Sequence, residues 1–117
     1  MATHDLGPEH DGRRLTVHGG DAVRLRLPEN PTTGYRWQWL DLDPRLAATL
    51  EDEFQPPAAA APGAGGVRIF RLRAVTAGSH RLALRCVRMW QAEGDPAATF
   101  EVVLDVIADL RTPGDPS

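Results

Sequence analysis

The feature that most constrains the fold is an alternation of apolar and polar residues in short segments along most of the chain. In residues 22–27, for example, Val23, Leu25 and Leu27 fall on one face and two arginines fall on the other. Alternation with a period of two is typical of half-buried β-strands, and glycine and proline separate the segments as turns do. Further segments of this kind are residues 15–17, 35–39, 67–75, 80–87 and 99–107.

Residues 41–54 carry a weaker pattern. Leu46 and Leu50 are four residues apart, which suits a short helical turn, but a strand over residues 46–54 fits as well. With that segment the chain has six or seven strands, turn signals at intervals of about ten residues and almost no helix. The sequence therefore predicts an all-β domain, either a sandwich or a small barrel.

The 117 residues fit one domain. Residues 55–66 are rich in proline, alanine and glycine, but a linker there would leave two pieces of roughly fifty residues, each of marginal stability alone. A long loop inside a single domain is therefore expected. The polar residues 1–13 are predicted to be a flexible N-terminus, residues 14–110 the domain, and residues 111–117 a disordered tail.

The charged residues argue against several classes of partner. The formal net charge is −3, and all 13 basic residues are arginines that alternate with apolar residues. We therefore expect no nucleic-acid partner, and no apolar run approaches the roughly 18 residues that a membrane span needs. An arginine-rich edge strand favours a monomer.

Because no apolar signal segment is present, the sequence as written predicts a cytoplasmic protein, or a secreted or periplasmic one if a signal has been removed.

Candidate catalytic groups are few. Cys86 is in phase with Leu82 and Leu84, which predicts a small buried core residue rather than a nucleophile. Ser79 and His80 are neighbours, but adjacency in sequence does not make a hydrogen-bonded dyad. The histidines lack the spacing of metal ligands, and no glycine-rich nucleotide motif is present. We therefore expect no catalytic residue, no metal site and no cofactor.

Three loops punctuated by glycine and proline remain as candidate binding elements: the first loop (residues 29–34), the second loop (residues 55–66) and the third loop (residues 88–97). In a sandwich with the strands in this order, all three connections emerge at one end. Antibody variable domains present their binding loops at that end. Within the first loop, Asn30 can hydrogen-bond its own backbone, Pro31 restricts φ and Gly34 permits a positive φ, so the tip is held in one shape before binding.

The three loops also carry a resemblance. The stretches ENPTTGY (residues 29–35, with Trp37 beyond), GAGG (63–66) and RMW (88–90) resemble, in content, order and spacing, the signature loops of the chagasin family of cysteine protease inhibitors. The resemblance spans residues 15–107 and implies an immunoglobulin-like β-sandwich of about seven strands. It also implies reversible, non-covalent inhibition of papain-like cysteine proteases. Met89 replaces the proline of the family's usual Arg-Pro-Trp motif, which removes a backbone restraint from the third loop.

The resemblance further implies that the three loops occlude the active-site cleft of the protease. Thr32 would lie nearest the catalytic cysteine, and Trp90 would anchor the third loop. The glycines of the second loop would let its backbone approach the cleft closely. The residues that the resemblance implies for protease binding are Asn30, Pro31, Thr32, Thr33, Gly34, Tyr35, Gly63, Ala64, Gly65, Gly66, Arg88, Met89 and Trp90.

Structural roles stay open for several of these residues. Asn30 and Gly34 suit a plain turn, Tyr35 and Trp37 suit the core, and Trp90 suits a cap on the end of a strand. The second-loop glycines are also compatible with flexibility alone. The alternative function is an immunoglobulin-like protein-binding module that does not inhibit proteases, and an enzyme is a third class.

Overall fold

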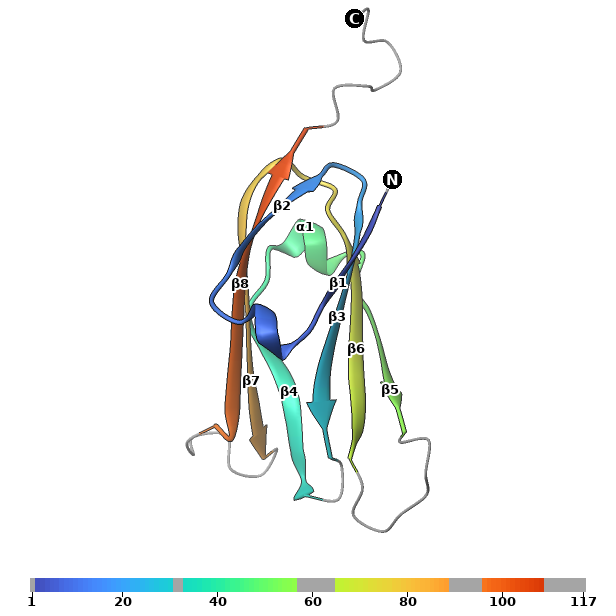
Figure 1. The fold of residues 1–117 in the computed structure, drawn as a ribbon, viewed down its shortest axis with the longest axis vertical. Helices are drawn as coiled ribbons and strands as arrows, with labels where there is room; N and C mark the ends of the chain where they lie inside the picture. Colours follow the sequence, from blue (N-terminus) through green and yellow to red (C-terminus); the bar gives the residue numbers. More distant parts are fainter. Residues whose placement is uncertain (1, 31–32, 57–64, 89–95, 109–117) are drawn as a thin grey trace, which may run out of the picture.

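Two four-stranded β-sheets pack face to face in the computed structural model of the chain (Figure 1). The structure describes residues 2–30, 33–56, 65–88 and 96–108. The first sheet has the order β1 (Thr3–Leu6), β3 (Ala22–Glu29), β6 (Gly66–Arg73) and β5 (Glu51–Gln55). The second sheet has the order β2 (Arg14–His18), β8 (Ala98–Ile107), β7 (Gly78–Arg88) and β4 (Tyr35–Asp41).

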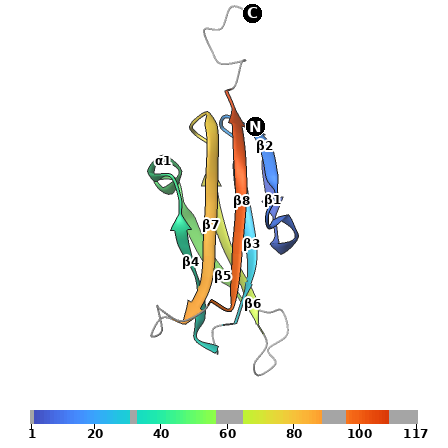
Figure 2. The same ribbon diagram turned by 90° about the vertical axis from the view of Figure 1, so that its left-hand side faces the viewer.

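Each sheet combines antiparallel strands with one parallel edge strand. β1 runs parallel to β3, β2 runs parallel to β8, and all other neighbours are antiparallel. In Figure 2 the second sheet faces the viewer, with β7 and β8 in front. The prediction of an all-β, immunoglobulin-like sandwich is confirmed, with eight strands in the described part of the chain where about seven are predicted.

The core lies between the sheets and is built from the apolar phase of the alternating segments. Along β3, the side chains of Val23, Leu25 and Leu27 are each 1% exposed, whereas Arg26 on the other face is exposed. Burial of such side chains is the main stabilising contribution to a sandwich of this size. The central strands of the second sheet contribute equivalent buried side chains, which are Leu82, Leu84, Phe100, Val102, Leu104 and Val106.

The weakly patterned stretch contains both of the elements that its sequence allows. A short helix, α1 (Pro44–Ala47), begins where the Asp43 side chain accepts a hydrogen bond from the Arg45 N–H at 2.8 Å, and β5 follows. The cap and Pro44 in the first turn favour helix initiation. Leu46 is fully buried and closes one end of the core. Within the described residues, no helix is long and apolar enough to cross a bilayer.

The N-terminal residues differ from the prediction of a flexible segment over residues 1–13. Thr3–Leu6 form β1, which pairs with β3, and a 3-10 turn (Pro8–His10) follows. The buried Asp21 carboxylate holds this segment: it accepts hydrogen bonds from the N–H groups of Ala2 and His18, each at 3.0 Å, and lies 2.8 Å from the His4 ring. Backbone pairing and this carboxylate attach a polar segment that has no apolar alternation of its own. The predicted tail, residues 111–117, lies outside the described residues.

Candidate functional site

The strand ends that flank the three loops all lie at one end of the sandwich, at the bottom of Figure 1. The strand register requires this arrangement, since Glu29 pairs with Gly66 in the first sheet and Tyr35 pairs with Arg88 in the second. The predicted clustering of the loops is therefore confirmed for their described ends. Six of the candidate binding residues lie outside the described residues: Pro31, Thr32, Gly63, Ala64, Met89 and Trp90.

The described part of the first loop forms a tight hydrogen-bonded turn. The Asn30 carbonyl accepts hydrogen bonds from the Thr33 N–H at 3.1 Å and from the Thr33 hydroxyl at 2.7 Å. Gly34 has a φ of +80°, as its predicted role requires, because side chains rarely tolerate that conformation. Thr33 thus closes the turn with its own hydroxyl, a structural role that the sequence alone does not reveal.

Tyr35 and Arg88 connect the first loop to the third. The Arg88 guanidinium stacks over the Tyr35 ring, with 4.8 Å between the guanidinium carbon and the ring centroid. Both side chains are half-buried, so Tyr35 is neither a core residue nor a fully exposed one. A cation over an aromatic face is stabilising by about 0.5–1 kcal/mol at such sites, which helps to fix these strand ends relative to each other.

The two described glycines of the second loop have different environments. Gly66 is buried, and a Cβ at this position would lie 2.4 Å from the Gln55 carbonyl oxygen and 2.5 Å from the Phe54 ring, so glycine is required there. Gly65 is exposed and lies against the first loop, because a Cβ there would be 3.5 Å from the Asn30 Cβ. Of the two, only Gly65 is placed to meet a partner.

An open pocket of about 420 Å³ lies among the three loops. Four of its nine lining residues are glycine, proline or alanine. Such small side chains leave room for the backbone of a partner to approach the backbone of this chain. The residues that line it are Pro28, Glu29, Asn30, Thr33, Tyr35, Gly65, Gly66, Cys86 and Ala97.

The candidate catalytic groups, Cys86, Ser79 and His80, are buried or bonded to other partners. Burial, and secondarily the charge of Glu29, raises the pKa of the Cys86 thiol, so the reactive thiolate is disfavoured. The Ser79 hydroxyl donates to Asp105 at 2.5 Å, whereas the His80 ring Nε2 lies 2.8 Å from the Thr76 carbonyl oxygen. Ser79 and His80 therefore have separate partners and form no dyad. Among the described residues, no three His, Cys, Asp or Glu side chains gather as metal ligands.

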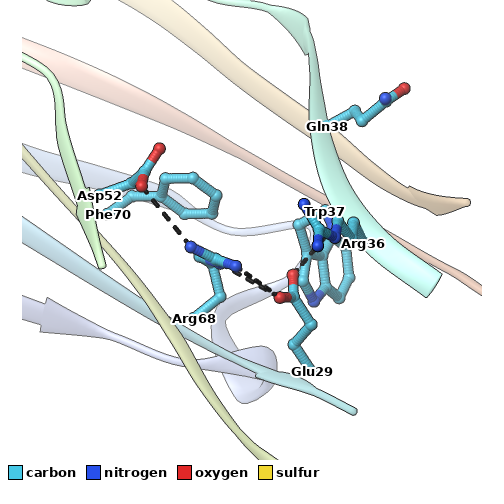
Figure 3. Close-up of a pocket in the computed structure, with 7 residues that line it drawn as sticks. All are labelled: Glu29, Arg36, Trp37, Gln38, Asp52, Arg68 and Phe70. Carbon is cyan, nitrogen blue, oxygen red and sulfur yellow. Dashed lines mark hydrogen bonds and ion pairs between the residues drawn. The ribbon is translucent and has the colours of Figure 1, made fainter. Parts of the chain in front are cut away.

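Sequence reasoning misses a group of three residues beneath the first and second loops, Glu29, Arg68 and Trp37 (Figure 3). The Arg68 guanidinium donates to Glu29 Oε1 from Nη2 at 2.8 Å and from Nε at 3.2 Å. The Trp37 N–H donates to Glu29 Oε2 at 3.1 Å, and its indole N–H donates to the Pro28 carbonyl at 2.8 Å. A signal was present in the pattern, because Glu29 and Arg68 occupy the apolar phase of their strands.

Comparisons with known proteins agree with the loop motifs. The family described as Chagasin family peptidase inhibitor I42 matches residues 16–104. Chagasin of Trypanosoma cruzi is 32% identical over an alignment of 106 positions, and the match covers 87% of this chain and 96% of chagasin.

Solved structures show the same fold. The cysteine protease inhibitor EhICP2 of Entamoeba histolytica has a TM-score of 0.78 at 22% identity, and the match covers 92% of this chain and 97% of that one. PbICP-C, whose structure is a complex with falcipain-2, has a TM-score of 0.55 at 12% identity, over 91% of this chain and 99% of that one.

Proposed function

This chain belongs to the chagasin family of peptidase inhibitors, and from that membership we infer that it inhibits papain-like cysteine proteases reversibly and without a covalent bond. The structural observation that carries the proposal is that the strand ends flanking the three loops lie together at one end of the sandwich. The alternative, a binding module without inhibitory activity, is not favoured by the family match.

The mechanism is occlusion of the active-site cleft. A papain-like protease cleaves an extended peptide in a long cleft with a thiolate–imidazolium pair. An inhibitor must fill that cleft without placing a scissile carbonyl in line with the sulfur. The first loop suits this task, because the Thr33 turn and the positive φ of Gly34 fix its exit before any protease binds. Ordering costs are then met in the free protein, which raises affinity.

The roles of individual loop residues follow from the family motifs. Thr32 lies nearest the catalytic cysteine, and the short threonine side chains fit a narrow cleft. Trp90 anchors the third loop on the rim of the cleft with Arg88 beside it, since tryptophan and arginine are enriched among residues that dominate binding energy. Gly65 presents second-loop backbone on the other side. Such an interface would bury about 800 Å² on each partner.

Inhibition by this mechanism needs no catalytic group in the chain itself, and we propose that it has no enzymatic activity of its own. The buried Cys86 thiol, with its raised pKa, supports this proposal. The protease supplies the only reactive sulfur in the complex, and the inhibitor withholds a cleavable bond from it.

The test is a titration of papain with the purified protein, in which the remaining papain activity is measured as the rate of cleavage of a small fluorogenic peptide. Competitive inhibition in the nanomolar range is expected. No inhibition at micromolar concentration, against papain and two cathepsin-type proteases, would contradict the proposed function.

Two loop variants and one control separate binding from folding. Thr32→Ala and Trp90→Ala are each expected to weaken inhibition about tenfold or more, with an unchanged unfolding midpoint. Thr16→Ala, an exposed threonine on β2 away from the loops, is expected to change neither quantity. If the two loop variants unfold the domain instead, those residues hold the structure and do not act as contacts.

A further inference from the structure

The inward-facing positions of the first sheet change from apolar to charged residues next to the loops. In β3 the buried apolar residues Val23, Leu25 and Leu27 are followed in the same phase by Glu29, whose side chain is 1% exposed. In β6 the same phase runs from Leu72 through Phe70 to Arg68. An ion pair between the buried Glu29 carboxylate and the partly buried Arg68 guanidinium, whose side chain is 20% exposed, therefore occupies the place of the last apolar layer of the core.

This pair is embedded in further contacts. Besides its two hydrogen bonds to Glu29, the Arg68 guanidinium lies 5.5 Å from the centre of the Phe54 ring, and its Nη1 is 3.5 Å from Asp52 Oδ1. Figure 3 shows Arg68 between the two carboxylates, with Trp37 on the far side of Glu29. The Glu29 carboxylate thus bonds to β6 in its own sheet and to β4 in the opposite sheet.

The strands joined at this carboxylate carry the bases of two loops. Glu29 is the last residue of β3 and precedes Asn30, and Trp37 lies two residues beyond Tyr35 at the other end of the first loop. Arg68 lies two residues beyond Gly66, where the second loop ends. Gly65 also lies close to Asn30, since a Cβ at position 65 would be 3.5 Å from the Asn30 Cβ, so the described ends of the two loops are neighbours.

Stability alone does not explain a charged pair at this position. Removing two charges from water costs several kcal/mol per ion, and replacing a buried pair with well-packed apolar side chains is often neutral or stabilising. Apolar side chains at these positions would, however, make no directional bonds and so would not fix the orientation of the strand ends. Backbone pairing already holds β3 beside β6. A guanidinium and a carboxylate meet in a narrow range of geometries, so Arg68 orients the Glu29 carboxylate, and the bond from the Trp37 N–H to that carboxylate places β4 of the opposite sheet relative to β3.

We propose that Glu29 is a positioning residue for protease binding. Together with Arg68 and Trp37, it holds the two ends of the first loop, which lie in opposite sheets, in a fixed relation to each other, so that the loop enters the cleft beside the second loop without rearrangement. The proposal rests on the proposed function, and it assigns to this chain a determinant of affinity that lies beneath the contact surface.

The decisive variant is Glu29→Gln combined with Arg68→Met. The glutamine oxygen still accepts the Trp37 N–H, and methionine retains much of the arginine stem, but the ion pair is lost. We expect the dissociation constant for papain to rise about tenfold, because the loops must then be ordered during binding. The unfolding midpoint is expected to stay the same or to rise, since one buried and one partly buried charge are removed. A purely structural role predicts instead that affinity follows stability.

The matched control is Glu53→Gln combined with Arg71→Met. This pair also joins the first sheet, through Arg71 Nη2 and Glu53 Oε1 at 2.6 Å, but it lies on the exposed outer face. Its removal is expected to leave papain binding unchanged. A dissociation constant for the Glu29→Gln, Arg68→Met protein within twofold of the unaltered chain would overturn the proposal.

If the Glu29→Gln, Arg68→Met protein is also less stable, a second measurement separates a positioning role from a general loss of stability. Water-exchange NMR should show faster exchange of the Thr33 amide, which bonds to the Asn30 carbonyl, with no change at a core amide such as that of Leu84. Equal Thr33 rates in both proteins would refute the positioning role. If the unaltered chain leaves papain active, the proposed function fails instead, and the Thr33 exchange still tests whether Glu29 holds the loop.

Discussion

Single glycines in the second loop differ in what they tolerate, and Gly66 is the stricter of the two. A Cβ at position 66 would meet a backbone oxygen and an aromatic ring at under 3 Å, and a backbone oxygen cannot move aside cheaply. Gly66→Ala is therefore expected to lower the free energy of unfolding by about 2 kcal/mol or more. Urea denaturation followed by tryptophan fluorescence would measure the change.

Gly65→Ala is the control for this prediction. Its Cβ would have ordinary van der Waals neighbours, and the expected change in unfolding free energy is within about 0.5 kcal/mol. Equal losses in the two variants would mean that loop flexibility, and not close approach, is what the glycines provide. The sequence GAGG cannot distinguish these cases, because the carbonyl that crowds Gly66 belongs to Gln55 on the neighbouring strand.

At the scale of elements, alternation was sufficient to predict most strands but not all of them. Alternation predicts β3 and β8 because a period of two is a local property of the sequence. It does not predict β1, because the polar residues of β1 carry no such period, and its parallel partner and the Asp21 carboxylate come from elsewhere in the chain. The Glu29–Arg68 pair is predictable only in part. The sequence shows a charged residue at an apolar position of each strand, but which two residues meet depends on the strand register.

The attachment of β1 leads to a pH prediction. Hydrogen bonds from His4 first, and then from the Ala2 and His18 N–H groups, hold the pKa of Asp21 well below its usual value of 3.8. Because the folded-state pKa is depressed, the stabilisation is fully present above about pH 4 and is lost as the pH falls towards the folded-state pKa. Asp21→Ala is expected to cost about 2 kcal/mol at neutral pH, because the donors that it leaves must find other partners.

The measurement is the urea midpoint of both proteins between about pH 5 and pH 2. The unaltered chain should lose more stability over this range than Asp21→Ala does. Asp5→Ala is the control on β1 itself: it removes only an exposed ion pair between Asp5 and Arg24 of β3, and its pH curve should match that of the unaltered chain. Parallel pH curves for the Asp21 variant and the unaltered chain would show that the carboxylate does not anchor β1.

At the scale of the whole molecule, an open sandwich must avoid pairing its edge strands with those of other copies. β5 is an edge strand of the first sheet, and its Glu51, Asp52 and Glu53 are all exposed. The expectation of an arginine-rich edge strand is wrong, because the arginine-rich strands β3, β6 and β7 lie inside their sheets. Acidic residues on the β5 edge repel the same edge of a second copy, and the expectation of a monomer then depends on them. We predict that Glu51→Val with Glu53→Val produces concentration-dependent association, whereas the unaltered 12.8 kDa chain sediments as a single monomeric species.

Net charge offers a competing explanation for such association, and a second variant separates the two. Glu101→Val with Asp105→Val also removes two acidic groups from a chain of net charge −3, but from β8, whose two neighbours β2 and β7 already occupy both of its edges. If the edge is what matters, the β5 variant associates and the β8 variant remains monomeric in sedimentation velocity at equal concentration. Equal association of both would attribute the monomeric state to overall repulsion between molecules. An edge-specific result would mean that the acidic strand keeps the sandwich monomeric and leaves the loop end free for a protease.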